Sequence, residues 1–168
     1  MKIRKALLFL MSSLLLVGCG NYKTKTSEIK TTVMAEGPFF EGSNSLIGEV
    51  QLNYSEFLED KEFNKVAEVT INQITVELED NQELSLEQFS SAAIQLVSDN
   101  SPMTSIAIMN PIKINDNKLQ LTVSNEAKVT SFFQEEKFSL LLDLDFKEDS
   151  YAEELKATIK INLSIEYK

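Results

Sequence analysis

Residues 157–167 read Ala157-Thr-Ile-Lys-Ile-Asn-Leu-Ser-Ile-Glu-Tyr167, in which apolar and polar side chains alternate almost without interruption. Successive side chains of a β-strand point to opposite faces, so this alternation predicts a strand with one face in the core and the other in solvent. A second alternating run covers Phe138–Phe146. A polar connection separates the two runs, and we expect them to form an antiparallel pair. The end of the chain therefore predicts an all-β domain.

Five further segments have shorter strand-like patterns, at 46–54, 66–78, 93–98, 103–109 and 118–123. Within 66–78 the apolar residues change parity at Asn72-Gln73, and a bulge there would keep both halves on the core face. About seven antiparallel strands without βαβ alternation favour a β-sandwich of immunoglobulin-like or fibronectin-III-like arrangement. We also expect one short crossover helix near 125–134, which would place Val129, Phe132 and Phe133 over one end of the core.

Composition excludes several classes of site. The 168 residues include no histidine, no tryptophan and one cysteine, with 16 Lys+Arg against 26 Asp+Glu. Without histidine there is no Ser-His-Asp triad and no His-ligated zinc, and one cysteine permits no intramolecular disulfide. A net charge of −10 argues against binding nucleic acid. The five glycines form no phosphate-binding loop, so we expect no cofactor.

The N-terminus has the pattern of an export signal. Lys2, Arg4 and Lys5 precede an apolar stretch over 6–17, which is too short to span a bilayer as a helix. The stretch ends in Leu16-Val17-Gly18-Cys19, which resembles the lipobox of bacterial lipoproteins. The resemblance implies cleavage between Gly18 and Cys19 and a lipid anchor on Cys19. With Gly20 after the cysteine, it also implies the outer membrane in an organism that has one, with the domain periplasmic or at the cell surface.

These features divide the chain into three parts: a signal peptide over 1–18, the acylated Cys19 with a flexible tether over 19–45, and the folded domain over 46–168. Removal of the leader leaves 13 Lys+Arg against 26 Asp+Glu, a net charge of −13. An acidic domain is repelled by anionic lipid, so we expect it to stand away from the membrane surface. Phe39 and Phe40 interrupt the tether, either docked on the domain or exposed as an aromatic pair.

Acidic residues are the main candidates for chemistry. Asp143 and Asp145 lie on one face of a predicted strand, where they could bind calcium or act as a carboxylate pair. The ligand spacing of calcium loops is missing, so a solvated outer face is favoured. The acidic runs at 77–83 and 148–154 have the same two interpretations, and polar turns are favoured. Of the tyrosines, Tyr151 alone is predicted to be both exposed and within the domain, which makes it the one candidate platform for a sugar ring.

The sequence therefore favours a non-enzymatic, lipid-anchored envelope protein that presents a binding or structural module. Its expected partners are the membrane, through the lipid on Cys19, and an envelope protein or glycan. The alternative is a calcium-dependent or carboxylate-using hydrolase with Asp143 and Asp145 in its site.

Overall fold

The computed structural model describes residues 22–53, 65–79 and 83–168. These residues form nine strands and contain no α-helix. The strands are β1 (Lys23–Glu36), β2 (Gly42–Gln51), β3 (Val66–Leu78), β4 (Phe89–Val97), β5 (Thr104–Met109), β6 (Ile114–Asn115), β7 (Lys118–Val123), β8 (Lys137–Phe146) and β9 (Glu154–Tyr167). Two short 3-10 turns, η2 (Leu86–Gln88) and η3 (Phe132–Gln134), precede β4 and β8.

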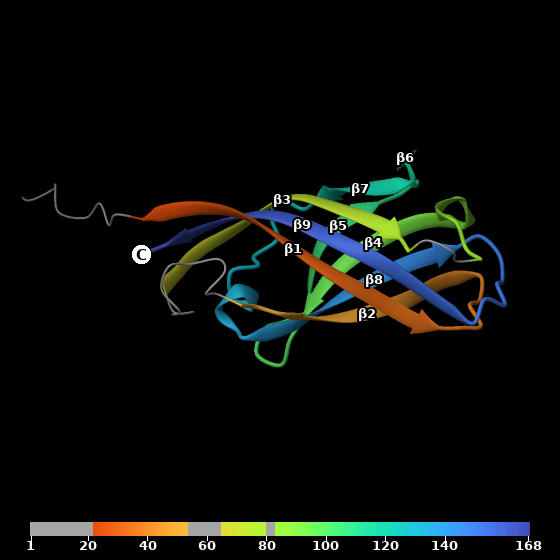
Figure 1. Cartoon of the computed structure of the whole chain (residues 1–168), viewed down its shortest axis with the longest axis horizontal. Helices are drawn as coiled ribbons and strands as arrows, with labels where there is room; N and C mark the ends of the chain where they lie inside the picture. The colour runs from red at the N-terminus through yellow and green to blue at the C-terminus, as the bar shows by residue number, and fades with distance from the viewer. Residues whose placement is uncertain (1–21, 54–64, 80–82) are drawn as a thin grey trace, which may run out of the picture.

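Eight of the strands close into an antiparallel β-barrel (Figure 1). Their order is β3-β9-β1-β2-β8-β4-β5-β7, and β7 pairs with β3 to complete the ring. The closing pairs are Ile74↔Leu121, Thr75↔Gln120 and Val76↔Leu119. The short β6 extends the sheet as a hairpin with β7, through a turn with positive φ angles at Asp116 and Asn117.

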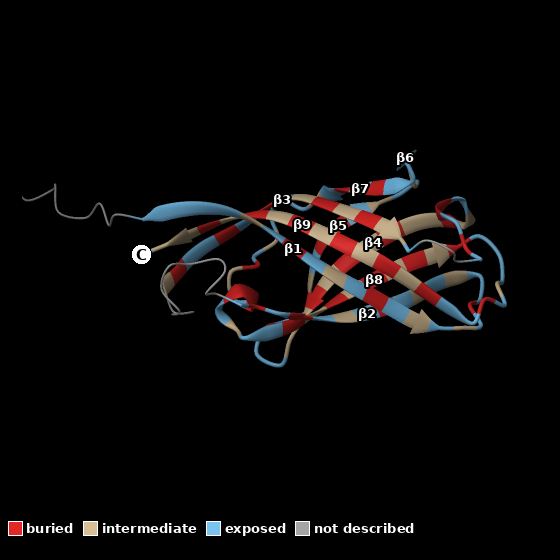
Figure 2. Ribbon diagram, in the orientation of Figure 1, coloured by how far each residue is buried: buried red, intermediate tan, exposed pale blue. Residues whose placement is uncertain are grey.

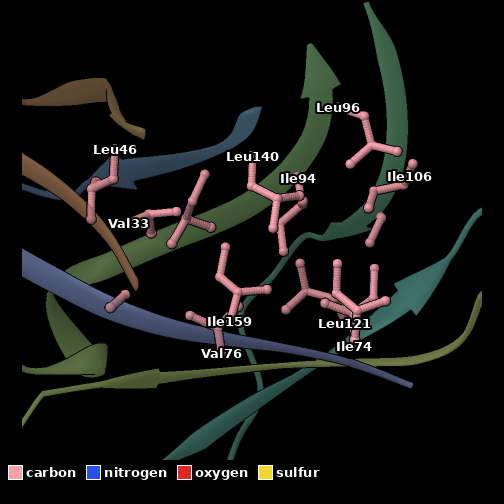
Figure 3. Packing of buried hydrophobic residues seen from close by; sticks show 14 of the residues in the cluster. Val33, Leu46, Ile74, Val76, Ile94, Leu96, Ile106, Leu121, Leu140 and Ile159 are labelled. Atoms are coloured by element: carbon pink, nitrogen blue, oxygen red, sulfur yellow. The ribbon is translucent and has the colours of Figure 1, made fainter. Parts of the chain in front are cut away.

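The barrel interior is filled by the apolar face of each strand. Burial alternates residue by residue along β8 and β9, so their inward positions are buried and their outward positions are partly exposed (Figure 2). Figure 3 shows side chains from different strands meeting in the interior, among them Val33, Leu46, Ile94 and Ile159. Each of these four is fully buried. The pattern of alternation therefore forms one continuous core.

Phenylalanine rings pack at both ends of the core. At one end Phe39 stacks on Phe146 with ring centroids 5.2 Å apart, and Phe89 meets Phe146 edge-on at 4.7 Å. At the other end Phe132 and Phe133 lie against Phe138, with centroids 6.0 and 5.3 Å away. All six rings are buried.

The predicted sandwich is wrong, because the sheet closes on itself. Period-two alternation requires that each strand has one core face, and both a sandwich and a barrel satisfy that requirement. The difference depends on β3, which pairs with β9 on one edge and β7 on the other. The last two strands do not pair with each other as predicted: β8 lies between β2 and β4, and β9 lies between β1 and β3.

The predicted helix at 125–134 is also wrong. Only η3 is helical there, and the residues before it form turns and irregular chain that contact β3. The backbone N–H of Val69 donates to Thr130 Oγ1, and Gln134 Nε2 donates to the carbonyl oxygen of Val66. Val129-Thr130-Ser131 are poor helix formers. The predicted burial of Val129, Phe132 and Phe133 is confirmed.

The tether predicted over 19–45 is wrong for residues 23–36, which form β1, and for residues 42–45, which begin β2. β1 pairs with β9 along its full length, from Lys23↔Tyr167 to Glu36↔Glu154. The sequence hides it because Ser27 and Thr31 occupy inward positions on either side of Ile29, so the apolar alternation is broken. The predicted bulge is confirmed: the β3–β9 register shifts between Ile71 and Gln73.

Candidate functional site

Asp143 and Asp145 lie on the outer wall of the barrel, on β8, and neighbouring strands supply their hydrogen bonds. Asp143 accepts hydrogen bonds from Ser45 Oγ of β2 and from Gln95 Nε2 of β4, the latter at 3.0 Å. Asp145 accepts one from Ser90 Oγ at 2.7 Å. Both carboxylates therefore connect β8 to its neighbours, and neither lines one of the five hollows described on this barrel.

The acidic run at 77–83 lies only partly within the described residues, since 80–82 fall outside them. Its first member, Glu77, contacts Lys118 Nζ at 3.0 Å and Lys160 Nζ at 2.9 Å. These two lysines lower the pKa of Glu77 below its ordinary value of 4.5, mainly through their hydrogen bonds to its carboxylate. Within the part of the chain that is described, no three acidic or cysteine side chains are arranged to hold a metal ion.

The second acidic run belongs to a pair of loops at one end of the barrel. We call residues 36–41 and 147–154 the distal loop pair, because they lie at the opposite end of β1 from its first residue (Figure 1). Two hydrogen bonds join them at Phe39 and Ser150, whose N–H groups each donate to the other's carbonyl oxygen, at 2.9 and 2.8 Å. Glu41 N–H also donates to Asp149 Oδ1 at 2.8 Å.

The inward and outward sides of this loop pair differ sharply. Phe39 points inward and is 2% exposed, stacked on Phe146. Its neighbour Phe40 is 62% exposed, and Tyr151 is 86% exposed. The alternation of an extended segment explains the difference, since residues next to an inward-facing position point outward. Of the two interpretations of the Phe pair, docking is therefore correct for Phe39 and exposure for Phe40. The predicted exposure of Tyr151 is confirmed.

Tyr151 borders a surface hollow of about 600 Å³. Glu36, Gly37 and Pro38 line one side of the hollow, and Ala152, Glu153 and Glu154 line the other. A side chain at Gly37 would collide with the Ala152 carbonyl oxygen, since an added Cβ would lie 1.9 Å from it. The hollow thus combines an exposed aromatic ring with hydrogen-bond acceptors, a combination that suits a sugar ring or a polar peptide.

The sequence did not reveal this hollow, because its two sides lie more than 100 residues apart in the chain. The predicted tether includes Glu36 to Pro38, and the sequence predicts only the exposure of Tyr151. The one local signal was the Gly37-Pro38 step, which the structure shows as a cis peptide between β1 and the docked Phe39.

A second hollow, of about 580 Å³, lies beside the start of β8 and was also missed. Its Glu135 carboxylate accepts hydrogen bonds from Ser98 Oγ and Ser101 Oγ, both at 2.9 Å, and from Asn100 Nδ2 at 3.2 Å. Ser101 is buried, and its N–H donates to Ser98 Oγ. Glu135 therefore orders the β4–β5 connection, which accounts for its bonds without a ligand.

The chain was compared with protein family models and with curated proteins. No protein family model matches the chain, and no curated protein matches it. No helix in the described segments has the length and apolar character needed to cross a membrane. The distal loop pair, with Tyr151, Phe40 and the adjoining hollow, is the candidate functional site.

Proposed function

We propose that the protein is a non-enzymatic, lipid-anchored envelope protein, which uses the distal loop pair to bind an envelope glycan or protein. The observation that carries the proposal is the exposure of Phe40 and Tyr151 on two loops that hydrogen bonds join to each other. Exposed aromatic rings are the residues that most often dominate binding surfaces. Loops that are already ordered lose little conformational freedom on binding. The free energy gained from contacts with a partner would therefore be offset only slightly by the ordering of these loops.

The lipid anchor is supported by the leader and by Leu16-Val17-Gly18-Cys19, and these residues precede the described part of the chain. The position of the loop pair is consistent with such an anchor. β1 starts at Lys23, close in sequence to Cys19, and the loop pair lies beyond the other end of β1. An anchor at Cys19 would therefore hold the candidate site away from the membrane, where a partner could reach it.

The anchor is tested by metabolic labelling with a palmitate analogue. Because Cys19 is the single cysteine, thioether and thioester lipids have no other site on the chain. We expect label on the wild-type protein, no label on Cys19→Ala, and loss of that variant from the membrane fraction. Equal labelling of both proteins, or stable membrane association of Cys19→Ala, would contradict the anchor.

The binding site is tested by photo-crosslinking in intact cells. A photoreactive residue at Tyr151 or Phe40 should give a discrete adduct, either with a protein or with envelope polysaccharide that a glycan hydrolase removes. Met103 provides a matched control, since it is 63% exposed and lies in the β4–β5 connection. The same adduct from Met103, or none from either loop residue, would contradict a site at the distal loop pair.

The hydrolase alternative makes a separate prediction. A calcium-dependent site at Asp143 and Asp145 requires carboxylates free to bind a metal, whereas both accept hydrogen bonds from serine hydroxyls here. If the alternative is correct, the protein hydrolyses glycosides or esters, and Asp143→Asn abolishes the activity without unfolding the barrel. Calorimetric titration with calcium provides the second readout, with heat expected only for the hydrolase.

A further inference from the structure

The start of β1, the end of β9 and the start of β3 form a projecting tip. We define the tip as residues 22–25, 65–69 and 165–168. Lys23 pairs with Tyr167, and Tyr167 pairs with Val66, so the three segments lie side by side. This end of the three-stranded ribbon extends beyond the other strands along the long axis of the barrel (Figure 1).

The tip is basic, in contrast to the rest of the protein. It contains four lysines and two glutamates, whereas the chain after the leader has twice as many acidic as basic residues. The lysines are Lys23, Lys25, Lys65 and Lys168; the glutamates are Glu68 and Glu166. The first residues of β1, including Lys23 and Lys25, are exposed (Figure 2). The distal loop pair is the reverse, with six carboxylates and one lysine.

Two tyrosines accompany these lysines. Tyr22 is 49% exposed, and Lys168 Nζ lies 5.3 Å from the centre of its ring. Tyr167 is partly exposed beside Lys23. Tyrosine is enriched at the interface between water and lipid, where its ring contacts the acyl boundary and its hydroxyl stays hydrated. Together, the tyrosines and lysines of the tip are suited to a surface that is both anionic and partly apolar.

Chain length brings this tip to the membrane if Cys19 is lipidated. Three Cα–Cα steps separate Cys19 from Tyr22, so the two Cα atoms are at most about 11 Å apart in any conformation of the chain. Electrostatic screening at physiological salt has a length of about 8 Å, so charges at the tip would act on the headgroups. The sequence predicts that the acidic domain stands away from anionic lipid on a long tether. Because β1 takes up most of that tether, the tip lies close to the lipid instead.

We infer that the tip is a lipid-binding surface, which rests on anionic phospholipid headgroups beside the anchored cysteine. Its lysines attract the headgroups, while the acidic distal loop pair is repelled and points away. The barrel then stands upright on the membrane and presents Tyr151 and Phe40 outward. This inference rests on the proposed lipid anchor, and its test is designed to be independent of lipidation in cells.

The test uses the purified chain from Cys19 onward, with one tetradecyl group attached chemically to the cysteine sulfur. A single chain of this length anchors only marginally, so the contribution of the tip is measurable as a partition coefficient. Partitioning is measured onto phosphatidylcholine vesicles and onto vesicles in which one third of the lipid is phosphatidylglycerol. We expect stronger partitioning onto the anionic vesicles, and a loss of that preference at high salt.

Charge variants then locate the contact. Lys23→Gln/Lys25→Gln should reduce partitioning onto the anionic vesicles by about 10- to 30-fold, at the usual contribution of a lysine near such a surface. Lys113→Gln/Lys147→Gln removes the same charge from exposed positions outside the tip and should have little effect. Equal losses from both pairs, or no preference for anionic vesicles, would overturn the inference. A negative palmitate-labelling result would instead contradict only the natural anchor.

Orientation is measured with single tryptophans, because the chain has none of its own. Tyr22→Trp should be quenched strongly by a lipid that carries a spin label on its headgroup. Tyr151→Trp should not be, because β9 alone separates the two ends by about 44 Å of strand. Strong quenching of both tryptophans means that the barrel lies flat on the membrane, and it overturns the upright arrangement.

Discussion

At the scale of single residues, adjacent aromatic side chains have opposite roles. Phe39 is buried and stacked on Phe146, and Phe40 next to it is exposed. The sequence could not separate the two, because both follow the same Gly-Pro step and both are equally apolar. Only the pairing of Phe39 with Ser150 determines which ring faces the core.

This difference in burial predicts a large loss of stability when the ring of Phe39 is removed and almost none when that of Phe40 is removed. Phe39→Ala removes a stacked, buried ring and should lower the free energy of unfolding by about 3 to 4 kcal/mol. Phe40→Ala serves as the matched control and should change it by less than about 0.5 kcal/mol. Urea unfolding followed by circular dichroism measures both values. Similar losses for the two variants would contradict the docking of Phe39 alone.

The lowered pKa of Glu77 makes the free energy of unfolding depend on pH. Lys118 and Lys160 lower its pKa in the folded protein, so the folded state binds this proton less readily than the unfolded state does. The stabilisation is therefore present above the ordinary pKa of 4.5 and is lost as the pH falls through the lowered pKa. The carboxylate is 24% exposed, so we expect only about 0.5 to 1 kcal/mol at neutral pH.

Comparison of Glu77→Gln with wild type measures this term. The difference in the free energy of unfolding should be largest at neutral pH and should shrink as the carboxylate becomes protonated in acid. Glu49→Gln provides the control, since Glu49 pairs with Lys137 at 3.2 Å but both side chains are more than half exposed. A constant difference for Glu77→Gln across the pH range would contradict the assigned ion pairs.

At the scale of elements, β1 is the long strand that the sequence pattern does not predict; the other is the two-residue β6. The outward positions of β1 are mostly polar, and its inward positions include Ser27 and Thr31, so it has the composition of a linker. β1 is held as a strand by its continuous pairing with β9, a strand that the sequence predicts from its strong alternation. A strand of this kind is specified by its partner and not by its own sequence.

Hydrogen exchange distinguishes β1 from a tether. Amides that donate to β9 should be protected, which amounts to about half of those in residues 24–33 because alternate amides face each edge of an antiparallel strand. A synthetic peptide of residues 22–36 gives the reference rate for an unstructured chain. If the amides of this segment exchange at the reference rate in the intact protein, residues 24–33 form a flexible tether and not a strand.

At the scale of the whole molecule, closure depends on short junctions between strands. β1 and β2 are joined by one register pair, β5 and β7 by two, and β3 and β7 by three. We call the β3–β7 junction the seam; the Glu77 ion pairs extend across it from β7 over β3 to β9. Seven of the nine strands in the described residues are predicted by the sequence, and β3 and β7 have the predicted bounds. The predicted strands are nonetheless compatible with two architectures, and the seam distinguishes between them.

A designed disulfide tests the seam. Thr75 and Gln120 are register partners on β3 and β7, within the separation that a disulfide needs. In a Cys19→Ala background, Thr75→Cys/Gln120→Cys should oxidise to an intramolecular disulfide, detected by mass and by mobility on a non-reducing gel. Thr75→Cys/Ser45→Cys joins β3 to β2, which are not neighbours, and should remain reduced. Oxidation of the second pair but not the first would exclude the closed barrel.

The sequence by itself determined which residues face the core in most strands, the bulge at Asn72 and the exposure of Tyr151, because these follow from local alternation and turn chemistry. Tertiary structure alone decided the closure of the barrel, the inclusion of β1 and the assembly of the distal loop pair. Each of these depends on hydrogen bonds between segments far apart in the chain, such as Lys23 with Tyr167. Alternation assigns a strand its two faces, whereas the partners on its two edges are chosen only when the whole sheet assembles.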